Sequence, residues 1–255
     1  MLAAPRAHFA GIEFDLCTED QLVGDLARRD DGGRFRYIVT PNTDHIVNLW
    51  PRRDGQYTEA FRRAYAAADR RVCDSRIVKL LAQMRGVDLT LIPGSDLTAR
   101  LFREVLTTGD KVLIVGGDET MLRDLQHRFP GPLYVQHIPP MGLLRNPEAV
   151  QDIIAFMAST RADFVLLAIG APQSELVAQK AAQQPGMRGV GLCIGASIEF
   201  LLERKARAPI WMRRMGLEWL HRLLSEPRRL WKRYLVHGPR IFWIALKDRS
   251  LDDGV

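Results

Sequence analysis

The 255-residue sequence lacks the features that mark several large classes of protein. It contains no run of about 18 consecutive apolar residues, so no segment is predicted to span a bilayer as a helix. The N-terminal residues do not form the continuous apolar stretch of a secretory signal peptide. The three cysteines, Cys17, Cys73 and Cys193, are scattered, without the paired spacing of a zinc site or a disulfide framework. These absences favour a protein of the reducing cytosol.

Common nucleotide-binding and metal-binding motifs are missing as well. The sequence has neither the Gly-x-Gly-x-x-Gly fingerprint of dinucleotide-binding domains nor the Gly-Lys-Ser/Thr of a Walker A loop. Their absence disfavours a Rossmann oxidoreductase and an ATPase of that type. No Asp-x-Asp pair occurs, and no group of His, Cys and carboxylate residues has metal-ligand spacing. We therefore expect no metal and no cofactor, so cationic side chains would have to neutralise any bound diphosphate.

What the sequence does have is positive charge concentrated near its C-terminus. Residues 204–233 contain ten Lys and Arg residues against Glu218 and Glu226, a net charge of +8, whereas the whole chain carries +6. The remainder of the chain therefore sums to −2, and the basicity is local. A local basic patch indicates an anionic partner that binds at one surface.

A helix is predicted to begin within this basic segment, after Ser225 and at Pro227. At about 100° per residue, its apolar and aromatic side chains fall on one face and its Lys and Arg side chains on the opposite face. Such a helix is typical of a membrane interface, although an ordinary surface helix that packs on its own domain has the same pattern. The apolar face comprises Leu230, Trp231, Tyr234 and Leu235, the basic face comprises Arg228, Arg229, Lys232 and Arg233, and Trp211, Trp219 and Trp243 lie nearby in the sequence.

The rest of the chain alternates short apolar strands with helices. Continuous apolar strands separated by helices predict an α/β fold with a doubly wound, mainly parallel, Rossmann-like sheet. We expect residues 1–205 to form this domain and residues 206–255 to form a basic, amphipathic helical appendage. A helix is predicted to open at Gly94 with Ser95 as its cap. The other predicted helices are 19–29, 43–50, 58–68, 75–84, 119–129, one from 147 and one ending near 183, and the predicted strands are 35–39, 71–73, 111–115, 133–138, 163–169 and 189–194.

Several polar residues and glycines directly follow the predicted strands. In a doubly wound sheet the ligand site lies beyond the carboxyl ends of the strands, so these residues should converge on one cleft. A Gly-Gly pair between a strand and a helix lets a backbone approach a phosphate, although a tight turn without a ligand is equally compatible with it. The strand-end residues are Thr40, Asn42, Asp74, Gly116, Gly117, Gly170 and Gly195.

Asp74 is the carboxylate best suited to act as a base. It follows the apolar residues Val72 and Cys73, and partial burial there would raise its basicity. The alternative is that Asp74 only caps the helix that starts near Ser75. Asn42 could bind a sugar or a phosphate, or could cap a helix, and His45 is expected to pack and not to react.

The order of several motifs resembles the WecG/TagA/CpsF glycosyltransferase family. The resemblance extends from about Tyr37 to Leu235. It starts with Thr40-Pro41-Asn42-Thr43-Asp44 and Cys73-Asp74-Ser75 and continues through Arg85-Gly86, Gly94-Ser95-Asp96-Leu97, Gly116-Gly117, Gly170-Ala171-Pro172 and Gly195-Ala196-Ser197-Ile198-Glu199-Phe200. A C-terminal signature completes it: Arg207-Ala208-Pro209, Trp211-Met212, Gly216-Leu217-Glu218-Trp219-Leu220, Arg222-Leu223 and Glu226-Pro227-Arg228-Arg229.

The resemblance implies an inverting, metal-independent glycosyltransferase of exopolysaccharide or cell-envelope synthesis. Such an enzyme transfers a hexosyl or N-acetylhexosaminyl group from a UDP-sugar to a polyprenyl-diphosphate-linked sugar acceptor. It would be cytoplasmic and peripheral on the inner face of the bacterial cytoplasmic membrane, would bind no nucleic acid, and could form a homo-oligomer.

The resemblance also implies roles for individual residues. Asp74 would be the general base, and Thr40 and Asn42 would line the catalytic pocket. The nucleotide would be bound by Gly116, Gly117, Gly142, Gly170, Gly195 and Glu199, and the acceptor's phosphates by Arg207, Arg214, Arg222, Arg228, Arg229 and Arg233.

The sequence departs from the family pattern at several positions. Gln173 and Ser174 stand where the family has Lys and Gln, Leu143 stands where an aromatic residue is common, and Ile198 and Glu199 replace Phe and Asp. These replacements leave the identity of the donor sugar open. Two other classes of function also stay open on the residues alone: a nucleic-acid-binding protein with an Arg-rich, aromatic helix, and a non-catalytic nucleotide sensor.

Overall fold

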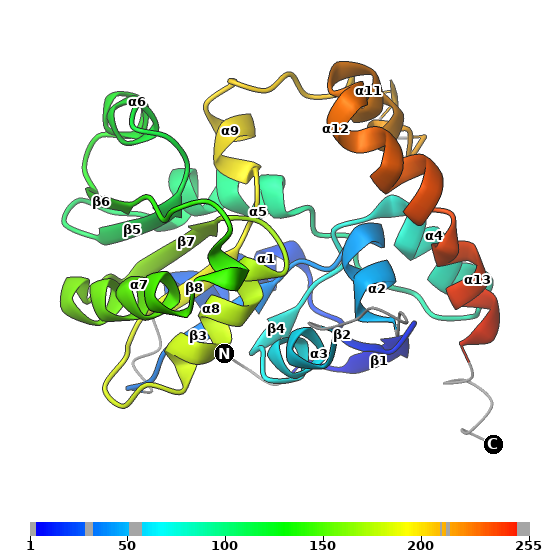
Figure 1. Ribbon diagram of the computed structural model, residues 1–255, viewed down its shortest axis with the longest axis horizontal. Helices are drawn as coiled ribbons and strands as arrows, with labels where there is room; N and C mark the ends of the chain where they lie inside the picture. The colour runs from blue at the N-terminus through cyan, green and yellow to red at the C-terminus, as the bar shows by residue number, and fades with distance from the viewer. Residues whose placement is uncertain (1–3, 29–32, 51–57, 210, 213–214, 249–255) are drawn as a thin grey trace.

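The computed structural model describes residues 4–28, 33–50, 58–209, 211–212 and 215–248. A six-stranded sheet, parallel throughout, forms the centre of the fold (Figure 1). Its strands, in spatial order, are β4 (Arg70–Arg71), β3 (Arg36–Val39), β8 (Val190–Cys193), β7 (Phe164–Ala168), β5 (Lys111–Gly116) and β6 (Leu133–His137). The predicted α/β class with a mainly parallel sheet is therefore confirmed.

Helices cover both faces of this sheet. Successive side chains of a strand point to opposite faces. Tyr37 and Val39 of β3 accordingly pack in one core, with α3 (Thr58–Ala66), α7 (Pro147–Thr160) and α8 (Gln173–Ala182), whereas Ile38 packs in the other. The second core contains side chains of α1 (Glu19–Ala27), α5 (Gly94–Arg100), η1 (Leu101–Val105), α6 (Met121–Arg128) and α9 (Ser197–Leu201). Because both faces are covered, the strands read as continuous apolar runs in the sequence.

The cap predicted for one of these helices is wrong. Ser95 does not cap α5; Pro93 occupies the N-cap position and makes no side-chain hydrogen bond to the helix. The backbone N–H of Gly94 is instead bound by the carboxylate of Asp74, which comes from a segment 20 residues earlier. A cap supplied from elsewhere in the fold leaves no local signal in the sequence.

An N-terminal hairpin was not apparent in the sequence. Strands β1 (Arg6–Phe9) and β2 (Ile12–Asp15) pair antiparallel around a two-residue turn. Both turn residues have positive φ angles, 54° at Ala10 and 81° at Gly11, as a type I′ turn requires. Alanine is unusual at such a position, which explains why the pattern did not predict a hairpin.

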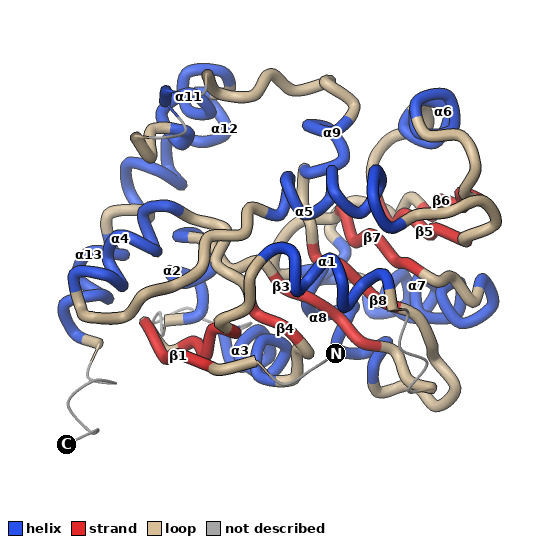
Figure 2. Tube along the Cα trace, turned by 180° about the vertical axis from the view of Figure 1, so that it is seen from behind, coloured by secondary structure: helices blue, strands red, loops and turns tan. Residues whose placement is uncertain are grey.

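The C-terminal helices lie along one end of the molecule. They are α11 (Glu218–Ser225), α12 (Pro227–Trp231), η3 (Lys232–His237) and α13 (Arg240–Lys247). Seen from behind, they run down one side, next to α2 (Thr43–Leu49) and α4 (Arg76–Met84) (Figure 2). The apolar residues Ile241 and Ile244 of α13 are fully buried in the same core as α2 and α4. This last helix therefore packs on the α/β domain.

The predicted apolar face of the C-terminal segment is partly packed on the chain and partly exposed. Leu230 is buried and Tyr234 lies against Trp219, with 6.1 Å between the ring centres. Trp231 and Leu235 are exposed. Half of this face thus packs on the chain itself and half is open to a partner. Among the described residues, no helix combines the length and the apolar character needed to cross a bilayer.

A buried ion cluster joins the hairpin to the sheet. Asp15, at the end of β2, accepts a hydrogen bond of 2.9 Å from the backbone N–H of Arg71 and lies 3.3 Å from its guanidinium. The guanidinium of Arg70 is 3.8 Å from the same carboxylate. All three side chains are buried. Arg70 also lies 3.2 Å from Asp25, so the Asp15 carboxylate matters most for the charge of Arg71.

We predict that Asp15→Ala will lower the free energy of unfolding by about 3–5 kcal/mol, because it removes the carboxylate that is paired with the buried guanidinium of Arg71. Urea denaturation measures the change. Glu13→Ala is the matched control, since Glu13 pairs with Arg6 at the surface, and it should cost less than about 1 kcal/mol. Equal losses in the two variants would contradict this account.

Candidate active site

The carboxylate of Asp74 ties three segments together at the carboxyl edge of the sheet. Its Oδ1 accepts a hydrogen bond of 2.7 Å from the backbone N–H of Gly94, and its Oδ2 lies 3.5 Å from the amide nitrogen of Asn42. The backbone N–H of Asp74 donates to the carbonyl of Pro41 at 3.0 Å. Ser75, and not Asp74, caps α4 through its hydroxyl. The alternative in which Asp74 caps the helix after Ser75 is therefore wrong, and its carboxylate binds the first backbone N–H of α5 instead.

Asn42 and Thr40 lie beside this carboxylate at the end of β3. The side-chain oxygen of Asn42 accepts from the backbone N–H groups of Asp44 and His45, so it caps α2. Its amide nitrogen is directed at the carboxylate of Asp74. Asn42 therefore caps α2 with its side-chain oxygen and contacts Asp74 with its side-chain nitrogen. Thr40 is buried and donates to the carbonyl of Cys193 at 3.2 Å, which joins the ends of β3 and β8.

The environment of Asp74 makes it more basic than an ordinary aspartate. Burial raises the pKa of its carboxyl to about 6, against the opposing effects of the Gly94 N–H, the Arg222 charge and the Asn42 amide. The negative charge of Glu218 raises the pKa further. A carboxyl with this pKa is mostly ionised at neutral pH and can still accept a proton.

Arginines of the C-terminal segment approach this site from the other side. Arg222 of α11 places its guanidinium 4.8 Å from the centre of the Phe200 ring and 3.5 Å from Glu218. Arg233 lies 3.4 Å from Asp44, two residues after Asn42. Arg207 lies 2.8 Å from the carboxylate of Asp96, which is a residue of α5. These three predicted residues are therefore brought together around the ends of β3, α4 and α5.

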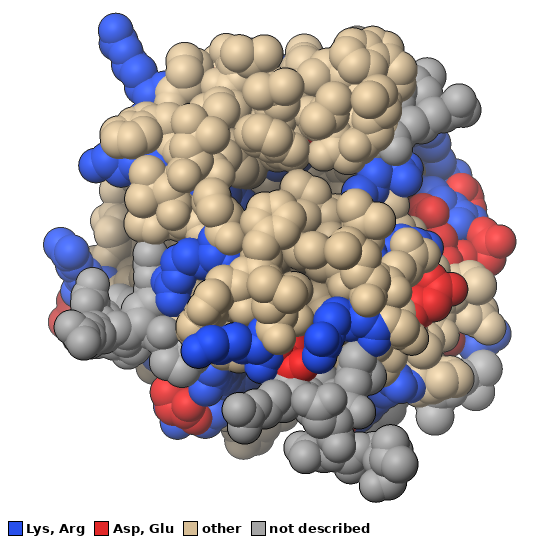
Figure 3. Space-filling view, turned by 90° about the vertical axis from the view of Figure 1, so that its right-hand side faces the viewer, with Lys and Arg blue, Asp and Glu red and all other residues tan. Residues whose placement is uncertain are grey.

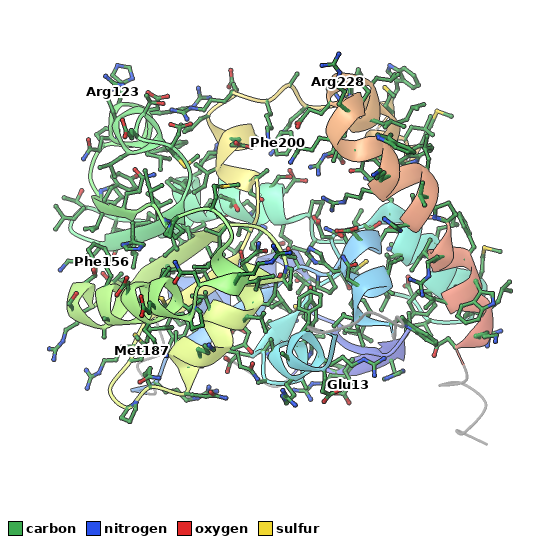
Figure 4. The ribbon with its side chains drawn as sticks, in the orientation of Figure 1. Glu13, Arg123, Phe156, Met187, Phe200 and Arg228 are labelled. Atoms are coloured by element: carbon green, nitrogen blue, oxygen red, sulfur yellow. The ribbon has the colours of Figure 1, made fainter. Side chains whose placement is uncertain are left out.

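The remaining predicted arginines do not join this group. Arg229 is exposed and pairs with Glu226 on its own helix. Arg228 lies at the outer end of α12, whereas Phe200 lies on the side of α9 that faces the C-terminal helices (Figure 4). Arg214 lies outside the described residues.

An open cavity lies between the sheet edge and these helices. Asp74 is not one of its lining residues, but Pro93 in its wall directly precedes Gly94, whose backbone N–H binds the Asp74 carboxylate. The wall combines cationic, anionic and aromatic groups, as expected of a site for a polar, charged ligand. Its lining residues are Arg76, Pro93, Ser95, Asp96, Phe200, Arg207 and Glu218.

The predicted glycines follow the other strands of the same sheet edge. Gly116 ends β5 with a φ of 105°, and a Cβ there would lie 2.9 Å from the carbonyl oxygen of Ala168 on β7. Gly117 has a φ of 78°, and a Cβ there would lie 2.5 Å from the sulfur of Met121. Gly170 and Gly195 follow β7 and β8, and Gly142 precedes η2 (Leu143–Arg145) beyond β6. All five glycines therefore lie at or after the carboxyl ends of strands, at the same edge of the sheet as Asp74.

Two ion pairs border this row of glycines. Glu199 is bound by Lys205, which also lies 3.8 Å from Glu226. Asp118, directly after Gly117, lies 2.7 Å from Arg204. The Thr120 hydroxyl and Arg204 hold the pKa of the Asp118 carboxyl down, at about 2. Both acids are therefore neutralised within the chain, and a nucleotide that used Glu199 would have to compete with Lys205.

Sequence reasoning missed two features of this region. Arg76 and Phe200 line the cavity, but neither stands out in a motif that has a chemical meaning. Glu175 is buried, its Oε2 has no hydrogen-bond partner among the residues that the structure describes, and burial raises its pKa to about 7. Its position directly after Gln173 and Ser174, where the sequence departs from the family pattern, was the only signal, and that position assigned it no role.

His45 packs, as expected from the sequence. Its Nδ1 lies 2.8 Å from the hydroxyl of Tyr65, and its ring meets Phe61 edge-on. Burial and the charge of Arg233 lower the pKa of its imidazole to about 3. The ring is therefore neutral at physiological pH. Within the described residues, His, Cys, Asp and Glu side chains form no group of three or more that could hold a metal ion.

The two charged groups of α11 should move the pKa of Asp74 in opposite directions. We predict that Arg222→Gln raises this pKa above 6, and that Glu218→Gln lowers it, because the first change removes a positive charge and the second a negative one. Carboxyl 13C NMR titration of Asp74 measures both shifts. Arg229→Gln, on the exposed side, should leave the midpoint unchanged, and shifts of the same sign for the two test variants would contradict the assignment.

A comparison with known families agrees with this geometry. The family model described as "Glycosyl transferase WecG/TagA/CpsF family" matches residues 7–253, which is nearly the whole chain. The match includes the Asp74 region, the row of glycines and the C-terminal arginines. The chain therefore belongs to the WecG/TagA/CpsF family of glycosyltransferases, which act in the synthesis of cell-envelope polymers.

Proposed function

We propose that this glycosyltransferase moves a sugar from a UDP-sugar to an acceptor sugar that is linked to polyprenyl diphosphate, with inversion at the anomeric carbon. The observation that carries the proposal is the setting of Asp74. Its carboxylate is fixed by Gly94 and Asn42 and has a pKa of about 6, and the segments on either side of it contribute Arg76 and Pro93 to the wall of an open cavity. A fixed base of this kind suits the deprotonation of an attacking hydroxyl.

The proposed reaction is a single displacement. The acceptor hydroxyl attacks the anomeric carbon of the donor from the face opposite the UDP group. A bond forms between that carbon and the acceptor oxygen, while the bond to the diphosphate oxygen breaks and its electron pair leaves with UDP. The hydroxyl proton passes to the carboxylate of Asp74. Thr40 and Asn42 keep the adjoining backbone in place through their bonds to Cys193 and to Asp74.

The departing diphosphate needs positive charge to stabilise it. We assign this role to arginines and not to a metal ion. Arg76 and Arg207 line the cavity, and Arg222 is close enough to lower the pKa of Asp74. A guanidinium group can donate two parallel hydrogen bonds to the oxygens of one phosphate, so arginines are suited to binding a diphosphate. The nucleotide would lie along Gly116, Gly117, Gly142, Gly170 and Gly195, with Glu199 released from Lys205 when it binds.

The C-terminal segment would also bring the enzyme to its lipid-linked acceptor. Trp231 and Leu235 are exposed next to the basic side chains of the same helices, and Trp at the boundary of an apolar surface is typical of a membrane interface. We therefore place the protein peripherally on the inner face of the cytoplasmic membrane. Residues 206–255 would be the part that binds acceptor and membrane, while residues 1–205 bind the donor.

The direction of the arginines favours this function over nucleic-acid binding. A protein that grips a nucleic acid backbone presents its Arg and Lys side chains along an open groove. Here Arg207, Arg222 and Arg233 turn toward acids around the Asp74 site. That arrangement suits a small anionic substrate held beside the base.

We predict that Asp74→Asn will lower the rate of transfer by about 10²- to 10⁴-fold, the usual contribution of a positioned base. The assay screens UDP-sugars for transfer to a short-chain polyprenyl-diphosphate-sugar, with EDTA present. Asp88→Asn is the matched control, since that carboxylate is largely exposed, and it should leave the rate unchanged.

The binding of UDP, measured by calorimetry, should persist in Asp74→Asn. If this variant transfers sugar at the rate of the unchanged protein, Asp74 is not the base. Transfer that EDTA abolishes would contradict metal independence. If the unchanged protein binds UDP but consumes no donor, a non-catalytic nucleotide sensor becomes the better account.

A further inference from the structure

The helix that follows Asp74 exposes apolar side chains that its own domain does not use. Val78, Leu81 and Ala82 of α4 are buried in the core. On its outer side Leu80 is 58% exposed and Met84 is 74% exposed. These two residues are four positions apart and therefore lie on the same face of the helix. A pair of large apolar side chains on one face indicates a surface that meets a partner.

This face of α4 continues onto the C-terminal helix α13. The two helices lie side by side in both views of the fold, and their inner residues share one core (Figures 1 and 2). Outward, α13 exposes Phe242, Trp243 and Leu246. The apolar surface therefore includes a helix of the catalytic domain as well as the C-terminal segment.

The charges around this surface are all of one sign within the two segments that form it. Residues 76–84 and 227–247 contain eight Lys and Arg residues and no Asp or Glu. Lys247 lies 4.2 Å from the centre of the Trp243 ring, and Lys79 lies 3.8 Å from Asp88, just beyond α4. From this side the molecule shows a broad uncharged surface that Lys and Arg border and cross, with fewer Asp and Glu residues toward its right and lower edges (Figure 3). Of the eight, Arg76 lines the cavity and Arg233 lies against Asp44, and the other six are Lys79, Arg228, Arg229, Lys232, Arg240 and Lys247.

This combination fits an anionic bilayer better than a second copy of the chain. In a symmetric dimer the same surface of each copy would meet the other. The Lys and Arg side chains of one copy would then face those of the second copy, and neither of the two segments contains an Asp or Glu to pair with them. Anionic lipid headgroups supply the missing negative charge, and Trp and Phe side chains favour the headgroup region. Charge complementarity thus selects the lipid surface.

We propose that α4 is part of the membrane-binding surface, with Leu80 and Met84 inserted into the headgroup region of an anionic bilayer beside α13. The proposal rests on the peripheral membrane association proposed above and adds the catalytic domain to it. Since α4 begins directly after Asp74 and Ser75, the lipid contact and the base belong to one rigid element. The depth at which α4 binds would then set the distance of the base from the membrane.

Single cysteines at the surface provide the first test. The native Cys17, Cys73 and Cys193 are buried, and burial raises their thiol pKa values, so a thiol-reactive fluorophore will label an added surface cysteine selectively. Met84→Cys carries the test label. Met141→Cys carries the control label, because Met141 is 98% exposed and lies beyond β6, at the opposite end of the sheet.

The labelled proteins are mixed with phosphatidylcholine vesicles, with and without one quarter phosphatidylglycerol, that carry brominated acyl chains. We expect bromine to quench the label at position 84 on the anionic vesicles only, and to leave the label at position 141 unquenched. An unquenched label at position 84 on vesicles that bind the protein would overturn the proposal. So would energy transfer between copies labelled at position 84 without vesicles, which would show that a second copy covers this surface.

A pair of matched double variants provides the second test. Leu80→Ser/Met84→Ser should weaken binding to the anionic vesicles about tenfold, because two apolar side chains no longer enter the interface. Leu133→Ser/Met141→Ser removes the same two residue types from the far end of the molecule and should bind as the unchanged protein does. Equal binding by the two double variants would overturn the proposal. Neither assay uses a donor sugar, so a failure of the proposed transfer reaction would be seen separately.

Discussion

The Asp74 carboxylate is the contact on which the arrangement of the site depends. It joins the end of β3, through Asn42, to the start of α5, through Gly94, and its own backbone continues into the capped helix α4. Burial raises the pKa of this carboxyl to about 6, whereas the hydrogen bonds from Gly94 and Asn42 that fix its position lower the pKa. The basicity of Asp74 is therefore a balance in which burial outweighs the bonds that hold the carboxylate in place.

The C-terminal segment packs on the α/β domain and contributes side chains to the surroundings of Asp74. Its last helix, α13, packs in a core shared with α2 and α4, while α11 and η3 bring Arg222 and Arg233 to the Asp74 side of the molecule. The positive charge that the sequence concentrates near its C-terminus is thus divided by function. Some arginines turn inward to acids at the site, and others, such as Arg228 and Arg229, remain at the surface.

Much of this arrangement could be predicted from local sequence. The apolar strands gave the parallel sheet, and Asn42, Ser75 and Asn146 cap the helices that were expected after them. What could not be predicted depends on contacts between distant segments. The cap of α5 comes from Asp74, the hairpin uses an alanine with positive φ, and Glu199 is occupied by Lys205. The inward turn of Arg233 toward Asp44 likewise follows from packing, since the helix pattern alone put it on an outer basic face.

The pH dependence of transfer by the unchanged protein tests the central claim most directly. If Asp74 accepts the proton, kcat/KM measured with a short-chain acceptor should fall with the ionised fraction of one carboxyl as the pH is lowered, with its midpoint near pH 6. A second profile, from Arg222→Gln, should have its midpoint at higher pH. A rate that stays constant between about pH 5 and pH 8 would contradict the account, because the raised pKa of Asp74 would then have no part in the reaction.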